Sequence, residues 1–247
     1  MISRAIELAW SVVATRRGPH LRLGHVLHPD GPLQKDFWKY SLPVLGNELV
    51  WGCGFTMYTV IMGHLGADAV AANSIANIVK DLLVCLSLGL GNAGGILVGN
   101  LLGRGDFQQA KAMGDRMCVL VAVVGTATGL LIVAARPLAL QWANLTPEAT
   151  RYLSVMPFVC AYYAACGCMT NLTIAGIFPA GGDAKFGLMC DAIVMWLIVV
   201  PVGLLAAFVF KLPVLVVYAL LNTDECIKMV PALLHYRKYR WLRNVTR

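Results

Sequence analysis

The chain has 247 residues, of which 58% are hydrophobic and 13% charged, and its formal net charge is +7. This composition, with a mean hydropathy of +0.69, excludes a soluble domain of ordinary composition and indicates a membrane protein. The apolar stretches lack the strict alternation of membrane β-strands, so we expect helices that cross the bilayer in about 20 residues each. Because the basic residues gather at the ends of these stretches, we expect no nucleic acid partner.

Six membrane-spanning helices are predicted, at residues 40–62, 69–101, 110–135, 152–178, 186–210 and 213–235. Residues 1–35 are expected to contain the tail of a preceding helix and a cytoplasmic linker. Residues 36–247 would form the six-helix transmembrane lobe with a basic cytoplasmic C-terminus. Lys and Arg are abundant before the first span, between the second and third and after the sixth, and they are scarce in the opposite connections. The positive-inside rule therefore predicts a multi-pass protein of the inner membrane with both termini in the cytoplasm.

The first predicted span carries a carboxylate in an otherwise uncharged stretch. Glu48 is the one formally charged residue between Tyr40 and Met62. An acidic residue near the centre of a membrane helix costs roughly 2.5–3.5 kcal/mol, so Glu48 needs a partner, a proton or water. On a helix it shares a face with Trp51 and Phe55, and an acidic surface with aromatic rings attracts organic cations. A structural hydrogen bond is the alternative interpretation.

The second span has a polar stripe. Asn73, Asn77 and Asp81 follow one another at intervals of four residues and so lie on one helix face, which must contact protein or water. Lys80 is adjacent, but neighbours in sequence diverge by about 100°, so we expect it to neutralise Asp81 only imperfectly. Asp81 could bind or relay an ion, or it could clamp one helix to another.

The later spans carry weaker polar signals. A milder polar stripe follows one face of the fourth span, with Asn171 beside it, and helix packing is its favoured interpretation; it consists of Tyr162, Cys166, Thr170 and Thr173. In the sixth span Asp224 and Glu225 precede Lys228 by four and three residues, an order that favours a helical ion pair, and we expect the three charges to neutralise one another. Asp191 is expected at the membrane interface, near the start of the fifth span.

No enzyme chemistry is indicated. The chain has no phosphate-binding loop, and its five histidines have no metal-ligand spacing. The eight cysteines lie within or beside apolar runs, where a thiol behaves as a small hydrophobic group, and no disulfide framework is implied. We therefore expect neither a catalytic residue, nor a metal site, nor a cofactor.

An ordered set of motifs resembles the multidrug and toxic compound extrusion (MATE) family of efflux transporters. The resemblance covers roughly residues 1–247 and is carried by "LPVLGNELVWGCGFTMYTVIMGHLGADAVAANSIANI", "ILVGNLLGRGDFQQAKAMGDR", "IFPAGGDAKF" and "HYRKYRWLRNV". Members of that family have twelve helices in two lobes and exchange protons or sodium ions for drugs. The resemblance therefore implies an all-α integral membrane protein whose six-helix bundle is the C-terminal lobe of such a transporter.

The resemblance also implies roles for particular residues. Glu48 matches the acidic residue that serves cation coupling in some branches of the family and would bind the coupling ion, H⁺ or Na⁺. From the polar stripe of the second span, we expect Asp81 to take part as well. A structural turn would be formed by Gly181, Gly182 and Asp183, in which the glycines free the backbone and Asp183 caps the next helix. Pro179 stands where the family commonly has an arginine. The expected substrate cleft is lined by Asn47, Trp51, Phe55, Asn77, Tyr162 and Thr170.

The function expected from these features is the ion-coupled efflux of drugs or organic cations. We expect the chain to be a fragment that works with a missing N-terminal six-helix lobe, or else a half-size protein that pairs with a second chain in the lipid bilayer. One alternative is a lipid-linked oligosaccharide flippase of the same superfamily, which would need a cationic cleft; Lys80 is the central candidate in the first five spans. The other is a membrane scaffold that transports nothing, in which Glu48→Gln would change stability and not flux.

Overall fold

The structure of the chain is a computed structural model that describes residues 5–6, 9–10, 13, 31–143 and 145–243. Contacts divide the chain into two compact units, residues 1–41 and 42–247. In the first unit the described residues are helical, and the rings of Phe37 and Trp38 meet edge to face with centroids 5.6 Å apart. The predicted cytoplasmic linker lies mostly outside the described residues, so this prediction stays untested.

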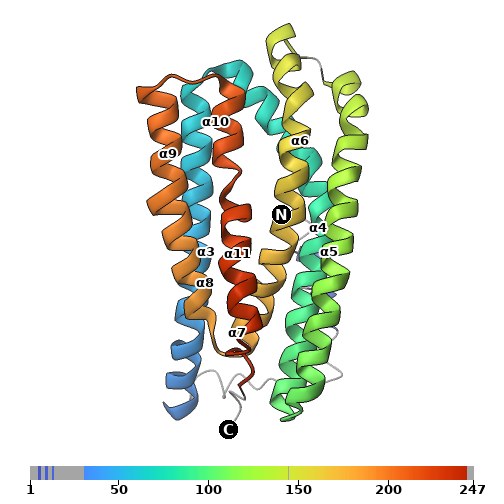
Figure 1. Ribbon diagram of the computed structural model, residues 1–247, viewed down its shortest axis with the longest axis vertical. Helices are drawn as coiled ribbons and strands as arrows, with labels where there is room; N and C mark the ends of the chain where they lie inside the picture. Colours follow the sequence, from blue (N-terminus) through green and yellow to red (C-terminus); the bar gives the residue numbers. More distant parts are fainter. Residues whose placement is uncertain (1–4, 7–8, 11–12, 14–30, 144, 244–247) are drawn as a thin grey trace. The chain divides into compact units, whose positions relative to one another are not determined.

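The described part of the chain consists of helices joined by short connections, as predicted, and it contains no strand. The first three predicted spans correspond to α3 (Gly31–His64), α4 (Ala67–Gly103) and α5 (Phe107–Trp142). Figure 1 shows α4 and α5 running side by side, and both pack against α6 (Pro147–Thr170). Within the second unit α3 contacts the fifth span, since Trp196 Nε1 donates a hydrogen bond to the Val50 carbonyl at 3.2 Å.

The fourth and fifth spans alternate between α-helical and π-helical turns. The fourth continues from α6 into η1 (Asn171–Ile177) and α7 (Phe178–Ala180). The fifth comprises α8 (Ala184–Asp191), η2 (Ala192–Val199), α9 (Val200–Leu204) and η3 (Leu205–Val209). A π-turn shifts the register of the side chains that follow it and is frequent at functional sites. Thr170 and Asp191 each lie immediately before such a turn.

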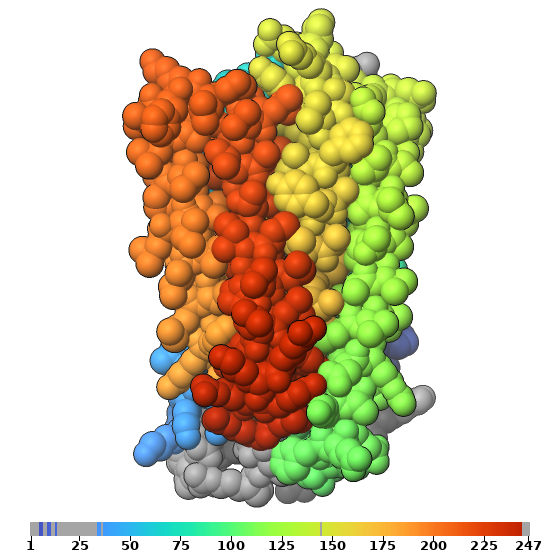
Figure 2. All heavy atoms as spheres, viewed as in Figure 1, coloured from blue at the N-terminus to red at the C-terminus, as the bar shows by residue number. Residues whose placement is uncertain are grey.

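The sixth predicted span is two helices, α10 (Val214–Leu221) and α11 (Asp224–Arg237), and a single helix over 213–235 was therefore wrong. The break is at Asn222 and Thr223, whose side chains bond to the carbonyls of Tyr218 and Leu220. The same carbonyls also accept the backbone N–H groups of Asn222 and Thr223. Figure 2 shows α10 and α11 covering the front face between the fifth span and α6. The break brings the acidic start of α11 beside α6, with which α11 is in contact.

Four helical stretches of the described residues are long and apolar enough to cross a membrane, at 67–103, 107–142, 147–180 and 184–209. These are the second to fifth predicted spans. The first span contains Asn47 and Glu48, and the sixth is divided into two short helices, so neither belongs to this set. The chain is an all-α, multi-pass membrane protein.

The turn between the fourth and fifth spans differs in part from the prediction. Gly182 has a φ of +76°, a conformation that favours glycine, and a Cβ on Gly181 would lie 1.9 Å from the Trp241 carbonyl oxygen. Asp183 occupies the N-cap position of α8, but its side chain makes no capping hydrogen bond. Its carboxylate lies 2.7 Å from His235 Nε2 instead, so the predicted cap is wrong and the carboxylate links this turn to α11.

Candidate functional site

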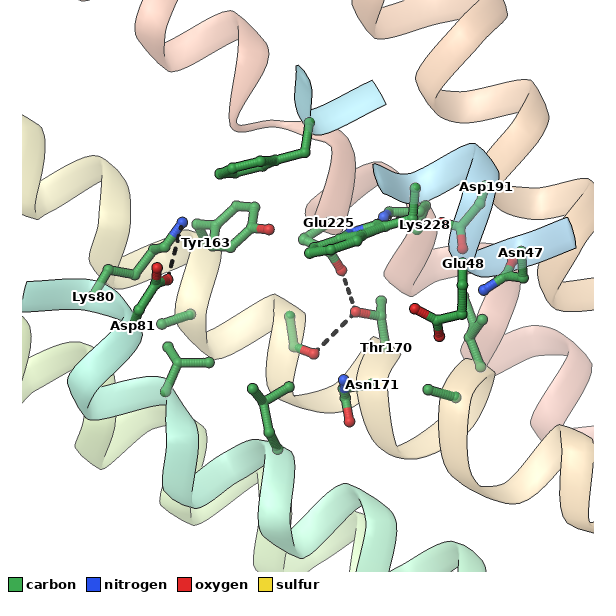
Figure 3. A pocket seen from close by; sticks show the side chains of 18 residues that line it. Asn47, Glu48, Lys80, Asp81, Tyr163, Thr170, Asn171, Asp191, Glu225 and Lys228 are labelled. Atoms are coloured by element: carbon green, nitrogen blue, oxygen red, sulfur yellow. Dashed lines mark hydrogen bonds and ion pairs between the residues drawn. The ribbon is translucent and has the colours of Figure 1, made fainter. Parts of the chain in front are cut away.

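The second unit contains a pocket of about 440 Å³ between α3, α4, α6, η1, α8 and α11 (Figure 3). Its lining combines apolar side chains with an unusual number of charged ones. The charged residues on its wall are Glu48, Lys80, Asp81, Asp191, Glu225 and Lys228. Charges are rare in membrane-spanning segments and mark pathways for ions or substrates, so this pocket is the candidate functional site.

One wall of the pocket is a buried cluster around Lys228. Its ammonium nitrogen lies 2.6 Å from Glu225 Oε1, 3.0 Å from Asp191 Oδ1 and 3.4 Å from Asp224 Oδ2. The Lys228 side chain is 2% exposed, and each of the three carboxylates is less than a tenth exposed. Three negative charges face one positive charge, so the cluster carries an excess of negative charge unless it binds protons or a cation.

The cluster is tied to α6 through a hydroxyl group. Thr170 Oγ1 donates a hydrogen bond to Glu225 Oε2, and it also lies 3.1 Å from the Gly167 carbonyl (Figure 3). Gly167 also lies close to the Glu225 side chain, since a Cβ at that position would be in ordinary van der Waals contact with it at 3.6 Å. Thr170 was predicted as a cleft residue, and its position at the end of α6 connects the fourth span to the charges of α11.

The opposite wall holds a second lysine. Lys80 Nζ lies 3.8 Å from Asp81 Oδ1 and above the ring of Tyr163, 4.7 Å from its centroid. Lys80 is buried, whereas the Asp81 side chain is 71% exposed. The ion pair is therefore long, and Lys80 neutralises Asp81 only in part, as the sequence indicated. The ring of Phe55 also lies within 5.7 Å of Lys80 Nζ. Two aromatic faces and a carboxylate therefore hold this ammonium group in place.

Glu48 lies on the wall formed by α3, and its carboxylate is directed into the pocket beside Asn47 and Thr170 (Figure 3). Trp51 and Phe55 follow it on the same face, with their rings stacked and their centroids 5.8 Å apart. Glu48 is exposed on this chain, although the sequence suggested a carboxylate deep among helices. Within the described residues it has no ion pair, so its carboxylate is open to a ligand.

Two of the expected cleft residues do not line this pocket. Asn77 donates a hydrogen bond to Asn73 Oδ1 at 3.1 Å, so these two residues of the stripe share a face, and Asn77 borders a smaller hollow near Tyr58 and Asn222. Tyr162 turns away and donates to the Ala219 carbonyl at 3.1 Å. Tyr162 thus joins α6 to α10, which fits the packing interpretation of its stripe.

Sequence reasoning missed the largest feature of the site. Asp191 was expected at the membrane interface, but it is 4% exposed and paired with Lys228. The helical spacing predicted that Lys228 would pair with Asp224 and Glu225, and this is confirmed. The sequence did contain a signal for a larger cluster. Two acids and one lysine within an apolar span leave one negative charge on α11 without a positive partner on the same helix.

A sulfur pair lies near the site. Cys166 on α6 and Cys226 on α11 are free thiols whose sulfur atoms are 3.0 Å apart. We expect a mild thiol oxidant such as diamide to join them, and peptide mapping after blockage of free thiols should identify the link. Cys226→Ser should abolish it, whereas Cys85→Ser, which removes an exposed thiol on α4, should not. An unlinked pair after complete oxidation of exposed thiols would contradict the proximity of α6 and α11.

Comparison with known proteins identifies the family. The MatE family model matches residues 43–205, about two thirds of the chain, and this range includes α4, α5, α6 and most of the pocket. The chain belongs to the MATE family of transporters. Curated relatives include a probable multidrug resistance protein NorM of Brucella suis, 24% identical over 94% of this chain, and the multidrug and toxin extrusion protein 1 of Oryctolagus cuniculus, 22% identical over 72%.

A solved structure shows the same fold for a MATE protein. An outward-facing multidrug resistance MATE transporter superposes with a TM-score of 0.73 at 14% identity, over 86% of this chain and 47% of that one. The chain also spans half of the Brucella suis protein and 31% of the rabbit protein. The six-helix arrangement of this MATE chain thus corresponds to about half of a solved transporter.

Proposed function

We propose that this MATE chain forms one lobe of an antiporter that expels organic cations or other drugs in exchange for H⁺ or Na⁺. The observation that carries the proposal is the pocket that joins Glu48, a carboxylate without an ion pair among the described residues, to a buried cluster with surplus negative charge. A buried group that has too few counter-charges binds a proton or cation readily. A cationic substrate and a coupling ion can then compete for the same negative charge.

The aromatic side chains of the pocket support a cationic or planar substrate. Trp51 and Phe55 present a stacked pair of rings next to Glu48, and such surfaces attract organic cations. In an alternating-access cycle, ion binding to Glu48 and to the Lys228 cluster would weaken their hold on the substrate. Release of the ion on the other side of the membrane would restore the affinity of Glu48 and the Lys228 cluster for the substrate. The exposed carboxylate of Asp81 borders the same pocket, which supports a part for Asp81 in this exchange.

The flippase alternative is less well supported by this geometry. A pyrophosphate group would need free cationic side chains in the pocket, but Lys228 is surrounded by three carboxylates and Lys80 by Asp81 and two rings. Each ammonium group thus already contacts acidic or aromatic side chains of the chain itself. We propose in addition that the lobe lies in the inner membrane, with both termini cytoplasmic, and works with an N-terminal lobe or a second chain. No enzymatic step or cofactor forms part of this mechanism.

Ethidium efflux from cells that carry the full protein tests the proposal. We expect Glu48→Gln to reduce ion-driven efflux to the level of cells without the protein, and Asp81→Asn to reduce it less, because Asp81 already has a partner in Lys80. The matched control is Glu148→Gln, an exposed acid in the first turn of α6, which should transport normally. Equal efflux by Glu48→Gln, Asp81→Asn and the unchanged protein at equal expression would refute the site. No efflux by the unchanged protein above the level of cells without it would favour a scaffold.

A further inference from the structure

The Lys228 ammonium group occupies the centre of the carboxylate cluster. An ammonium group has three N–H donors and no acceptor, and here three carboxylates, from two helices, lie within 3.4 Å of its nitrogen. Asp224 and Glu225 come from its own helix, and Asp191 comes from the end of α8. The position that a bound cation would take among these oxygens is filled by a cation of the chain itself.

A sodium ion and a proton differ in what they would need from this cluster. A sodium ion must gather several oxygen ligands at once, and here it would lie next to a fixed positive charge in a region of low dielectric, where like charges repel strongly. A proton binds one carboxylate oxygen and needs no shell of ligands. Asp224 Oδ1 is buried and has no hydrogen-bond partner among the described residues, so it has room for a proton.

We propose that Lys228 takes the place of a coupling cation in this cluster, so that the protein exchanges its substrate for protons and excludes sodium ions. The inference rests on the proposed antiport function and adds the identity of the coupling ion. Lys228 acts here as a specificity-determining residue: it supplies a permanent positive charge that leaves the carboxylates able to bind protons only. Other charged or titratable groups face the cluster from each neighbouring helix, namely Glu48 and Tyr58 on α3, Lys80 and Asp81 on α4, Tyr163 on α6 and Cys190 on α8.

Sodium binding to the purified full-length protein tests the inference without any transport assay. The midpoint of thermal unfolding in detergent is measured in sodium chloride and in choline chloride of the same ionic strength. The unchanged protein should have the same midpoint in both salts. Lys228→Gln vacates the cation position and should acquire a sodium-dependent rise of roughly 3–6 °C at saturation. Lys80→Gln, which removes the other pocket lysine but not the one in the cluster, should remain insensitive to sodium.

A second variant keeps the test decisive if Lys228→Gln cannot be purified. Lys228→Gln/Asp224→Asn has the net charge of the unchanged cluster and retains Asp191 and Glu225 as oxygen ligands, so it should bind sodium as well. Stabilisation of the unchanged protein by sodium would overturn the inference, and so would failure of both Lys228 variants to respond.

Efflux driven by a pH gradient in sodium-free medium separates the two proposals. If no efflux occurs under any gradient, the antiport function fails, while the sodium titration still reports on Lys228. If a sodium gradient alone drives efflux, the proposed antiport function is supported and the inference that Lys228 excludes sodium is wrong.

Discussion

Replacement of Lys228 by methionine is expected to destabilise the folded bundle by about 3–5 kcal/mol, the typical cost of leaving a buried ion pair without one partner. The methionine fills much of the same volume, so the loss comes from charge and not from a cavity. Three buried carboxylates would remain, with no counter-charge inside 3.4 Å. The measurement is the amount of monodisperse protein after solubilisation, followed by unfolding in detergent against a denaturant.

Partial rescue identifies charge as the cause. Lys228→Met combined with Asp224→Asn removes one of the uncompensated carboxylates and should recover part of the lost stability, with a coupling free energy of roughly 0.5–3 kcal/mol. Lys185→Met on α8 is the matched control, since that lysine is exposed and its loss should change stability by less than about 0.5 kcal/mol. If Lys228→Met is as stable as the unchanged protein, the cluster is not the electrostatic centre of the bundle.

The sequence predicts this fold well where hydrophobicity alone decides it. The second and third spans, 69–101 and 110–135, coincide with the interiors of α4 and α5, because a long apolar stretch in a bilayer has no alternative to a helix that satisfies its own backbone. The sixth span shows the limit of that rule. Its composition is apolar over 213–220, but the span is divided at Asn222 and Thr223, polar residues whose side chains bond to nearby backbone carbonyls.

The contacts of the site could be predicted where they join residues of one helix, but not where they join residues of different helices. The spacing of Asp224, Glu225 and Lys228 predicts their pairing. Glu48, Trp51 and Phe55, which the spacing places on one helix face, line the same pocket. The addition of Asp191 to the cluster depends on how the fifth span packs on α11 and on the π-turn that begins after it. Periodicity within a single helix contains no information about either, so Asp191 was assigned to the interface.

The glycines of α4 provide the second large expected effect. Substitution of Gly95 by alanine should destabilise the bundle by about 1–3 kcal/mol, because α4 lies directly against η1 at this point. A Cβ on Gly95 would lie 2.9 Å from the Cα and from the carbonyl oxygen of Gly176. Those are backbone atoms and cannot rotate away, so one helix must move. Small residues at such contacts let membrane helices approach closely.

Gly89→Ala on the same helix is the control. No atom lies within 4 Å of a Cβ at Gly89, and alanine is the better helix former, so this variant should be neutral or slightly more stable. The comparison uses unfolding in detergent, with cross-linking of Cys166 to Cys226 as a readout of whether α6 and α11 keep their contact. If helix propensity alone mattered, Gly95→Ala would stabilise the protein as Gly89→Ala does. A loss confined to Gly95→Ala means that the close contact of α4 with η1, which holds Asn171 against the pocket wall, governs the stability of this half of the bundle.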